Sequence, residues 1–578
     1  MLKTTQPTHM KQLTVIVLIL LAGVLPLQAL ELTRYVSADA TGDGLTPETP
    51  MGSLQMALNM SVRVDGATIY ITPGLYKANG DFPNIQLYGV KKLGKVEEME
   101  LCSQELSSDI DETKKPVLIG ETNFTNSSIY SVDAKGSISV NSGSLSYCTM
   151  TDRFNSGTAD QVTILNGVYG SGGQIGGQIN LFNCAFVNNK DAYQFGLNLS
   201  GEGHIFNCRF NGNKGGGLFM HGCDNLSFYD CEFADNEGIG AIESNSTGMN
   251  LNFINCKFIN NKKDRGDIRP AVTVHSATFC NCFFFKNDSE GYGPALMATS
   301  SNIKIVHCAF INNGMGFHYE GGAPEFTQII NTVFWNNGSL EGYDITRPRA
   351  DAYEPKMYRC ALPRGTGIPE LDKELGIICL SLKNNGTDPN ENYLAFDFKT
   401  HTLRKNSALI NAGILTDAMP YDIYNNSRIF FDMPDIGPFE FVGDSVIASS
   451  TTFTLKDSDG NDWKMGLGTT EFRDRKYHVI YPNPEYVEAG KPLPSLMNLT
   501  FAGFGDKGIT QYGSNLFNTA PFGGGYSLNI LSFNGSFPLN VKERYEYTSA
   551  SKAPTVRKAQ KPNTVIITAD GKNNYFSY

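Results

Sequence analysis

The chain has 578 residues, of which 18% are charged and 41% are hydrophobic, a composition typical of a folded protein rather than a disordered one. Lys and Arg number 47 against 58 Asp and Glu, so the formal net charge is −11. Phosphate contacts need a positive surface, so this acidic chain without a basic stripe is not expected to bind nucleic acid. The length indicates either several domains or one elongated repeat.

Residues 1–29 are predicted to be a cleaved signal peptide. Lys3 and Lys11 precede or open an apolar run from Leu13 to Leu27, and Ala29 follows as a small residue at a cleavage site. The alternative, a membrane anchor, is disfavoured because a span needs roughly 20 apolar residues and this run is shorter. No second long apolar segment occurs, so we expect no transmembrane segment in the mature chain and a secreted or cell-surface location.

The segment after the signal peptide predicts a short helix over Leu54–Met60 and a strand over Ala67–Thr72. The stretch Tyr35–Tyr76, with its phrases PMGSLQMAL, GATIYI and PGLY, resembles the opening of pectate-lyase-like β-helix proteins. That resemblance implies a right-handed parallel β-helix that starts with a capping helix.

One phrase then recurs seven times between residues 183 and 337. It consists of Asn, Asp or His, then Cys, any residue, Phe, and an Asn three residues after the Phe. Successive cysteines lie 24, 23, 25, 26 and 26 residues apart, at Cys184, Cys208, Cys231, Cys256, Cys282 and Cys308, and Thr332 takes the seventh place. A period in the low twenties indicates stacked supersecondary units rather than a globular core.

The alternation within each copy predicts a strand with one buried face. Phe206, Cys208 and Phe210 would share that face, and Asn207 and Arg209 the other. Strands that recur with the same parity stack in parallel about 4.8 Å apart, which predicts a Cys column and a Phe column inside the solenoid.

The Asn that follows each Phe is expected to mark a corner, where it adopts the left-handed conformation and bonds its amide from rung to rung. A leucine-rich horseshoe, the rival solenoid at this period, is disfavoured because its Leu-rich phrase is absent. We therefore assign residues 30–440 to the β-helix.

The cysteines admit three interpretations. Side chains in a column point in parallel, which is poor geometry for a disulfide, and metal ligands must converge tetrahedrally. Buried free thiols are favoured over disulfides, and disulfides over a metal site.

The middle of the chain also resembles the surface repeats of polymorphic outer-membrane proteins. Phe210–Asn213 precedes Gly215–Leu218, and Phe233–Asn236 precedes Gly240–Ile242. The resemblance implies adhesion and display at a cell surface.

The repeat stops near Glu440. The phrases Ser407–Gly413 and Asp435–Glu440 resemble the usual ending of the pectate-lyase-like group. Short alternating segments then predict a C-terminal β-domain at 445–545, a linker at 549–562 and a terminal strand and tail at 563–578. The predicted fold is thus all-β: a right-handed parallel β-helix with a short N-terminal capping helix and a smaller C-terminal β-domain.

The best cluster for chemistry is Asp230 and Glu232 on one strand, with Arg209 one rung below and Lys257 one rung above. Lyases of this fold hold Ca²⁺ with carboxylates and use Lys or Arg as the base, which makes these four weak candidates for a catalytic site. The favoured alternative is a ladder of ion pairs, because Arg209, Glu232 and Lys257 occupy one column of alternating charge.

Four aromatic residues, Phe228, Phe253, Phe279 and Phe283, fall on outward positions by parity. Outward rings are either stacked on sugars or covered by other parts of the chain, and cover is favoured.

These observations predict a secreted or cell-surface protein that binds a polysaccharide or cell-surface glycan without catalysis, in the manner of an adhesin. The alternative is a polysaccharide lyase or glycoside hydrolase of the pectate-lyase-like group, acting on an acidic polysaccharide, and only this alternative calls for Ca²⁺. The sequence identifies no cofactor, and it leaves the ligand, the oligomeric state and the mode of surface attachment open.

Overall fold

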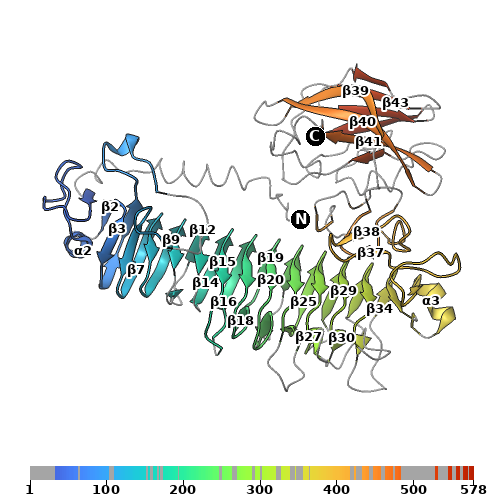
Figure 1. Ribbon diagram of the computed structural model, residues 1–578, viewed down its shortest axis with the longest axis horizontal. Coiled ribbons are helices and arrows are strands. Elements are labelled where there is room, and N and C mark those ends of the chain that lie inside the picture. Colours follow the sequence, from blue (N-terminus) through green and yellow to red (C-terminus); the bar gives the residue numbers. More distant parts are fainter. Residues whose placement is uncertain are drawn as a thin grey trace.

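A computed structural model gives the structure of the chain (Figure 1). It describes residues 33–441, and beyond them the backbone of the strands between 447 and 577. Within 33–441 the gaps are 63–65, 103–109, 151–153, 156–160, 166–167, 170–172, 193, 246–249, 263–269, 289–292, 300–301, 320–326, 339–344, 347–355, 364, 367, 415, 417–421, 425–427 and 429–432. The predicted signal peptide, residues 1–29, lies outside the described residues.

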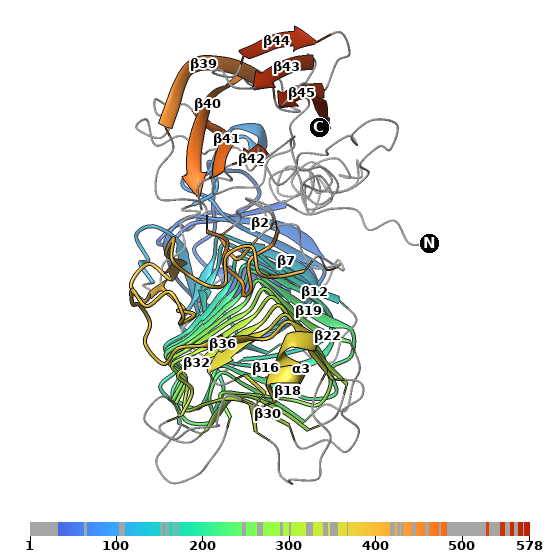
Figure 2. The ribbon, with the colours of Figure 1, turned by 90° about the vertical axis from the view of Figure 1, so that its right-hand side faces the viewer.

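The strands of residues 33–380 form a parallel solenoid, seen from its end in Figure 2. Its larger sheet, called sheet A, comprises β1 (Thr33–Val36), β2 (Ala67–Ile71), β4 (Gly80–Pro83), β5 (Ile85–Gly89), β7 (Thr122–Tyr130), β9 (Ile138–Ser146), β11 (Phe154–Asn155), β12 (Gln161–Leu165), β14 (Gly173–Phe182), β16 (Leu197–Phe206), β18 (Leu218–Met220), β19 (Leu226–Tyr229), β21 (Ile242–Ser244), β22 (Leu251–Ile254), β24 (Val272–Val274), β25 (Ala277–Cys280), β27 (Pro294–Ala298), β28 (Ile303–Val306), β30 (Met315–Tyr319), β31 (Gln328–Ile330), β33 (Ile345–Thr346) and β34 (Lys356–Tyr358).

The second sheet, called sheet B, closes the solenoid on its other side. It comprises β3 (Gly74–Lys77), β6 (Pro116–Ile119), β8 (Asp133–Ala134), β10 (Thr149–Met150), β13 (Val168–Tyr169), β15 (Ala185–Val187), β17 (Arg209–Asn211), β20 (Glu232–Ala234), β23 (Lys257–Ile259), β26 (Phe283–Phe285), β29 (Ala309–Ile311), β32 (Val333–Trp335), β35 (Ala361–Pro363) and β36 (Ile378–Leu380).

Three helices accompany the solenoid: α2 (Leu54–Val62), the 3₁₀ helix η2 (Val96–Glu98) and α3 (Pro369–Leu375). The helix and strand predicted at Leu54–Met60 and Ala67–Thr72 are confirmed as α2 and β2. Leu54, Ala57 and Leu58 of α2 are buried, so the helix covers the first rungs with its apolar face.

Each repeat phrase spans a corner rather than one continuous strand. The residue before each Cys has a φ between 49° and 56°, from Asn183 through Asn207 and Asp230 to Asn331. Asn and Asp tolerate this left-handed conformation better than other side chains do. The chain therefore turns from sheet A into sheet B at this residue, and the alternation of side chains restarts there.

This corner corrects the predicted position of several aromatic residues. Phe206 and Tyr229, which we expected inside, lie on the outer surface and are partly exposed. Phe228, Phe253 and Phe279, which we expected outside, have 0% exposure and stack in the core with ring centroids 4.8 Å apart. The sequence parity was wrong because it was counted straight through the left-handed residue.

The Cys and Phe columns of the phrase itself are confirmed. The Phe rings from Phe186 to Phe334 stack at centroid distances of 4.4–5.2 Å. The twelve cysteines are free thiols, and all except Cys379 are buried. The Cys184 N–H approaches the Cys208 sulfur at 3.4 Å, which is the rung-to-rung stacking that the spacing predicts.

The Asn after each Phe forms the expected ladder of amides. Asn213 Nδ2 donates to Asn236 Oδ1 at 3.0 Å, and Asn236 Nδ2 donates to Asn261 Oδ1 at 2.9 Å. These side chains are buried, but the left-handed residue is the one before, such as Asp235 with a φ of 54°. The predicted corner was therefore one residue too late, since the Asn points inward to close the turn while its neighbour makes it.

Residues 394–441 fold back over the outer face of sheet B at its C-terminal rungs and form a second core there. This segment, called the covering tail, includes the short hairpin β37 (Phe396–Asp397) and β38 (Thr402–Leu403). Phe283 packs edge to face against Phe439 at 4.9 Å, so the outward position predicted for Phe283 is confirmed and the chain itself covers it. A buried Arg428 joins the tail to the solenoid, because it donates to Glu440 Oε1 at 2.9 Å and to Asn281.

Beyond the tail the described strands form two further sheets. One contains β39 (Ile447–Lys456), β40 (Asp462–Phe472), β41 (Arg475–Pro482) and β42 (Leu528–Ile530), and the other contains β43 (Arg544–Ser549), β44 (Thr555–Ala559), β45 (Thr564–Ala569) and β46 (Lys572–Ser577). The expected linker, residues 549–562, therefore contains a strand: β44 pairs with β43 in an antiparallel hairpin, and Thr555 and Val556 supply the β-branched residues that favour it. The predicted terminal strand is likewise part of this sheet: β45 pairs with β43 in parallel, and β46 pairs with β45 in antiparallel fashion.

Candidate functional site

The four residues singled out from the sequence lie where three rungs of sheet B meet the solvent. Arg209 pairs in register with Glu232, and Glu232 with Lys257, so the expected column exists. The ion pairs do not form: among the described residues, neither cation lies within 4.0 Å of the Glu232 carboxylate. Glu232 Oε1 instead accepts a hydrogen bond from Asn211 Nδ2 at 2.6 Å.

Lys257 is held by the covering tail. Its ammonium group lies 5.1 Å from the centre of the Tyr424 ring, a cation–π contact. Burial, followed by the Asp422 carboxylate, raises the pKa of Tyr424 to about 12. The base proposed for a lyase is thus engaged with an aromatic ring.

Asp230 does not share the strand of Glu232, as the sequence suggested. It occupies the left-handed corner, in the column otherwise formed by Asn183, Asn207 and Asn255. In that column each amide donates to the rung below, as Asn207 Nδ2 does to Asn183 Oδ1 at 2.8 Å, and Asn255 Nδ2 donates to Asp230 Oδ1 at 3.0 Å. The Asp230 side chain has no N–H that could donate to the rung below. Its second oxygen therefore occupies the position at which the other rungs have an amide donor.

The surroundings of Asp230 favour its protonated form. Although the residue is partly exposed, the protein atoms around the carboxyl raise its pKa to about 6, against the opposing effects of the Asn255 amide and Lys257. Protonation supplies the missing donor. The described residues contain no group of three or more His, Cys, Asp or Glu side chains able to hold a metal ion; catalytic roles for Asp230, Glu232, Lys257 and Arg209, and Ca²⁺ binding, remain predictions.

One column of aromatic residues on the outer surface, Phe182, Phe206 and Tyr229, has its ring faces stacked on one another. Phe182 stacks on Phe206 at 5.2 Å with 4° between the rings, and Phe206 stacks on Tyr229 at 4.7 Å with 11°. Each ring therefore covers the face of the next, and their edges point outward. Stacking on sugars requires a free ring face, so this column serves packing instead.

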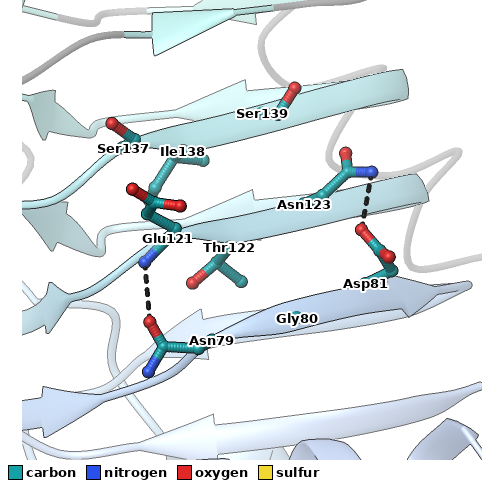
Figure 3. A pocket seen from close by; sticks show the side chains of 9 residues that line it. All are labelled: Asn79, Gly80, Asp81, Glu121, Thr122, Asn123, Ser137, Ile138 and Ser139. Atoms are coloured by element: carbon teal, nitrogen blue, oxygen red, sulfur yellow. Dashed lines mark hydrogen bonds between the residues drawn. The ribbon is translucent and has the colours of Figure 1, made fainter.

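A depression of about 560 Å³ opens on sheet A near the N-terminal end of the solenoid. Nine residues from three successive rungs line it: Asn79, Gly80, Asp81, Glu121, Thr122, Asn123, Ser137, Ile138 and Ser139 (Figure 3). Asn123 Nδ2 donates to Asp81 Oδ1 at 3.0 Å, and the Glu121 N–H donates to Asn79 Oδ1 at 3.0 Å. Amide, hydroxyl and carboxylate groups thus dominate its surface.

The depression is the start of a longer row, called the polar strip. Register places five outward side chains of sheet A in one row, at Asp81, Asn123, Ser139, Gln174 and Asn198, with the backbone of β11 between Ser139 and Gln174. The next position is Phe219, which stacks on Phe195 at 5.1 Å. Adjacent strands lie about 4.8 Å apart, so the five side chains of the strip are spaced by one or two such intervals along the solenoid.

Sequence reasoning missed the polar strip. Its residues lie before the Cys–Phe repeat or between its copies, and no fixed spacing links them because the loops between rungs differ in length. The usable signal was weaker: Gln174 and Asn198 each precede a buried aliphatic residue, Ile175 and Leu199. Aligning the rungs by their corners would have brought them together.

The comparisons with known proteins support this architecture. Residues 118–277 match the family model described as a right handed beta helix region. The predicted right-handed parallel β-helix is thereby confirmed, and the resemblance to polymorphic outer-membrane repeats stays a prediction. No curated protein matches the chain.

Solved structures with a similar fold come from phages and a bacterium. ORF18 of Geobacillus virus E2 shares 14% identity over 61% of this chain and 64% of its own, with a TM-score of 0.29. The A-module of the mannuronan C-5 epimerase AlgE4 of Azotobacter vinelandii shares 13% identity over 56% of this chain and 99% of its own, with a TM-score of 0.32. The tailspike gp49 of Acinetobacter baumannii bacteriophage Fri1, a capsular polysaccharide depolymerase, shares 10% identity over 83% and 82%, with a TM-score of 0.21.

Proposed function

We propose that this protein is exported and binds a polysaccharide along the polar strip of sheet A without cleaving it. The observation that carries the proposal is the register of the strip, in which five hydrogen-bonding side chains lie in one row along the solenoid and begin in an open depression. A polymer of sugars is itself a repeating row of hydroxyl groups. Side chains that both donate and accept hydrogen bonds are suited to such a ligand.

The rigidity of the solenoid adds to this suitability. Parallel strands fix the backbone of each rung, so the strip is ordered before the ligand arrives and binding orders little of the protein. The expected export through residues 1–29 brings such a surface into contact with extracellular glycans. Among the described residues, no helix is long and apolar enough to span a membrane.

The contacts of the charged column support binding over catalysis. A base must reach the proton that it removes, whereas Lys257 lies over the Tyr424 ring and the Glu232 carboxylate accepts from Asn211. Desolvation by the surrounding protein raises the pKa of Asp230, and its Oδ1 accepts a hydrogen bond from the Asn255 amide. These features describe a packed surface on sheet B, whereas the polar strip lies on sheet A.

Binding is tested with the protein and a glycan array, followed by titration calorimetry on the strongest polysaccharide. We expect Gln174→Ala combined with Asn198→Ala to weaken binding about thirtyfold, because each of the two lost hydrogen bonds contributes about 1 kcal/mol. Gln328→Ala is the matched control, since Gln328 is also an exposed, outward amide of sheet A but lies on β31, away from the strip. Absence of binding to every glycan, or equal loss in the control, contradicts the proposal.

The enzymatic alternative is tested with the same preparation. Acidic polysaccharides are incubated with the protein and Ca²⁺, and unsaturated ends are followed by ultraviolet absorbance and new reducing ends by a colorimetric assay. We expect no product. Steady release of product that is abolished in Lys257→Ala or Asp230→Asn would establish a lyase or hydrolase in place of a binding protein.

A further inference from the structure

The charge of the depression restricts which polysaccharide can enter it. Two of its nine lining residues, Asp81 and Glu121, carry carboxylates, both residues are exposed, and none of the nine is Lys, Arg or His. Further along, Ser139, Gln174 and Asn198 of the strip are uncharged. The strip therefore begins with negative charge and continues without a compensating cation.

The two carboxylates are available to a ligand. Asp81 Oδ1 accepts from Asn123, and no described residue donates to Asp81 Oδ2 or to the Glu121 side chain. Figure 3 shows both side chains in the depression, on neighbouring rungs. Asp81 Oδ2 and the Glu121 carboxylate therefore have capacity to accept hydrogen bonds from a ligand in an open site.

We infer that the polar strip selects polysaccharides that carry no carboxylate or sulfate groups. The inference rests on the proposed function and names its ligand class. Sugar hydroxyls donate to ionised carboxylates in charge-assisted hydrogen bonds, which are stronger than those between neutral groups. Gln174 and Asn198 supply both donors and acceptors for the remaining hydroxyls.

A uronic acid or sulfated polymer meets the opposite situation. Each of its anionic groups approaches Asp81 and Glu121 without a Lys or Arg in the lining to pair with it. Like charges at a surface repel within a Debye length of about 8 Å at physiological salt. Binding of such a polymer is therefore weakened at low salt, and the penalty falls as salt is added.

The test compares the affinity of the whole protein for four polymers: a neutral xyloglucan, the amine-bearing chitosan, polygalacturonate and a sulfated dextran. Asp81→Asn with Glu121→Gln removes two charges and keeps the acceptor for Asn123. Glu370→Gln with Glu374→Gln is the matched control, because both residues are exposed on α3 and the net charge changes equally. Figure 1 shows α3 at the other end of the solenoid from β7 and β9.

We expect the protein to bind xyloglucan or chitosan and to bind polygalacturonate about fourfold more weakly at low salt, since each of the two surface charges contributes roughly a factor of two. The Asp81 and Glu121 variant is expected to close this difference, while the α3 control retains it. Equal or tighter binding of polygalacturonate, unchanged in the variant, overturns the inference and leaves the proposed function intact. Failure to bind any of the four overturns both.

Discussion

The amide ladder offers the sharpest test of what holds the solenoid together, at Asn236. Its side chain has 0% exposure, and Nδ2 donates to Phe210 O at 2.7 Å and to Asn261 Oδ1 at 2.9 Å. Asn236→Asp keeps the shape of the side chain but replaces the donating Nδ2 with an oxygen. This new oxygen then faces the two buried acceptors, Phe210 O and Asn261 Oδ1, without a hydrogen to share. An unsatisfied buried acceptor costs about 1–3 kcal/mol, so we expect the free energy of unfolding to fall by about 2–6 kcal/mol.

The loss should depend on pH in a defined direction. Burial raises the pKa of the introduced carboxyl in the folded protein above its value in the unfolded chain. Ionisation therefore disfavours the folded state, so the loss is full above the folded pKa and shrinks as the pH falls through it, when the protonated carboxyl donates one of the missing bonds. Urea unfolding followed by circular dichroism, at neutral and at acidic pH, measures both quantities.

Asn207→Asp is the control, because this Asn also donates to the rung below but is exposed in the corner column. We expect a loss of about 0.5 kcal/mol or less, as at other surface positions. A loss of under 1 kcal/mol for Asn236→Asp at neutral pH, or equal losses at the two positions, would refute the reasoning.

Three further predictions concern buried charge and sulfur. Asp230→Asn should stabilise the protein above pH about 7 and have little effect well below a pH of about 6, because the raised pKa of Asp230 means that its ionised form costs stability; unfolding at the two pH values measures this. Lys115 Nζ lies 3.3 Å from Asp133 Oδ1 and both side chains are buried, so Lys115→Met should cost about 3–5 kcal/mol by stranding a carboxylate, and adding Asp133→Asn should restore part of that loss in the same assay. A thiol reagent should label only Cys379 rapidly in the folded protein and all twelve cysteines after unfolding, since the other thiols are buried; two or more fast thiols would contradict this packing.

The sequence predicted the architecture well because the repeat records a physical constraint. A column needs the same kind of side chain at the same place in every rung. Cys208, Phe210 and Asn213 are therefore recognisable in the sequence because the same residue types recur in each copy of the phrase. The inward direction of Cys208 and Phe210, and the amide bonds of Asn213, were predicted from this recurrence. The helix α2 and the strand β2 were also predicted correctly, from the spacing of their apolar residues.

The errors arose where backbone conformation changes the phase of that pattern. Asn207 is left-handed, so Ile205 and Cys208 both point inward although they are three residues apart. In the next rung Asp230 is the equivalent left-handed residue. Counting alternate residues straight through it placed Phe228 on the wrong face and Asp230 on the same strand as Glu232. The period of the sequence predicts where each corner recurs. The backbone φ at the corner determines whether the side chains on either side of it point inward or outward.

The candidate site was less accessible to sequence reasoning, for a different reason. The polar strip needs only hydrogen-bonding capacity at each of its positions, which Asp81, Ser139 and Gln174 supply equally well. Because many residue types satisfy this requirement, no single residue type recurs in the sequence at the positions of the strip. The covering tail escaped notice likewise, because its contact with Lys257 through Tyr424 joins segments far apart in the chain.

The left-handed corner also determines how this molecule can change its length. A chain lacking residues 208–230 would join Asn207 directly to Cys231 and regenerate the phrase Asn-Cys-Glu-Phe, so a whole coil is lost while every column stays continuous. Inserting a single residue after Phe210 would instead turn the buried side chains of that coil toward water. Solenoids of this kind can therefore grow and shrink by complete coils, and the span of surface offered to a long ligand changes in the same steps.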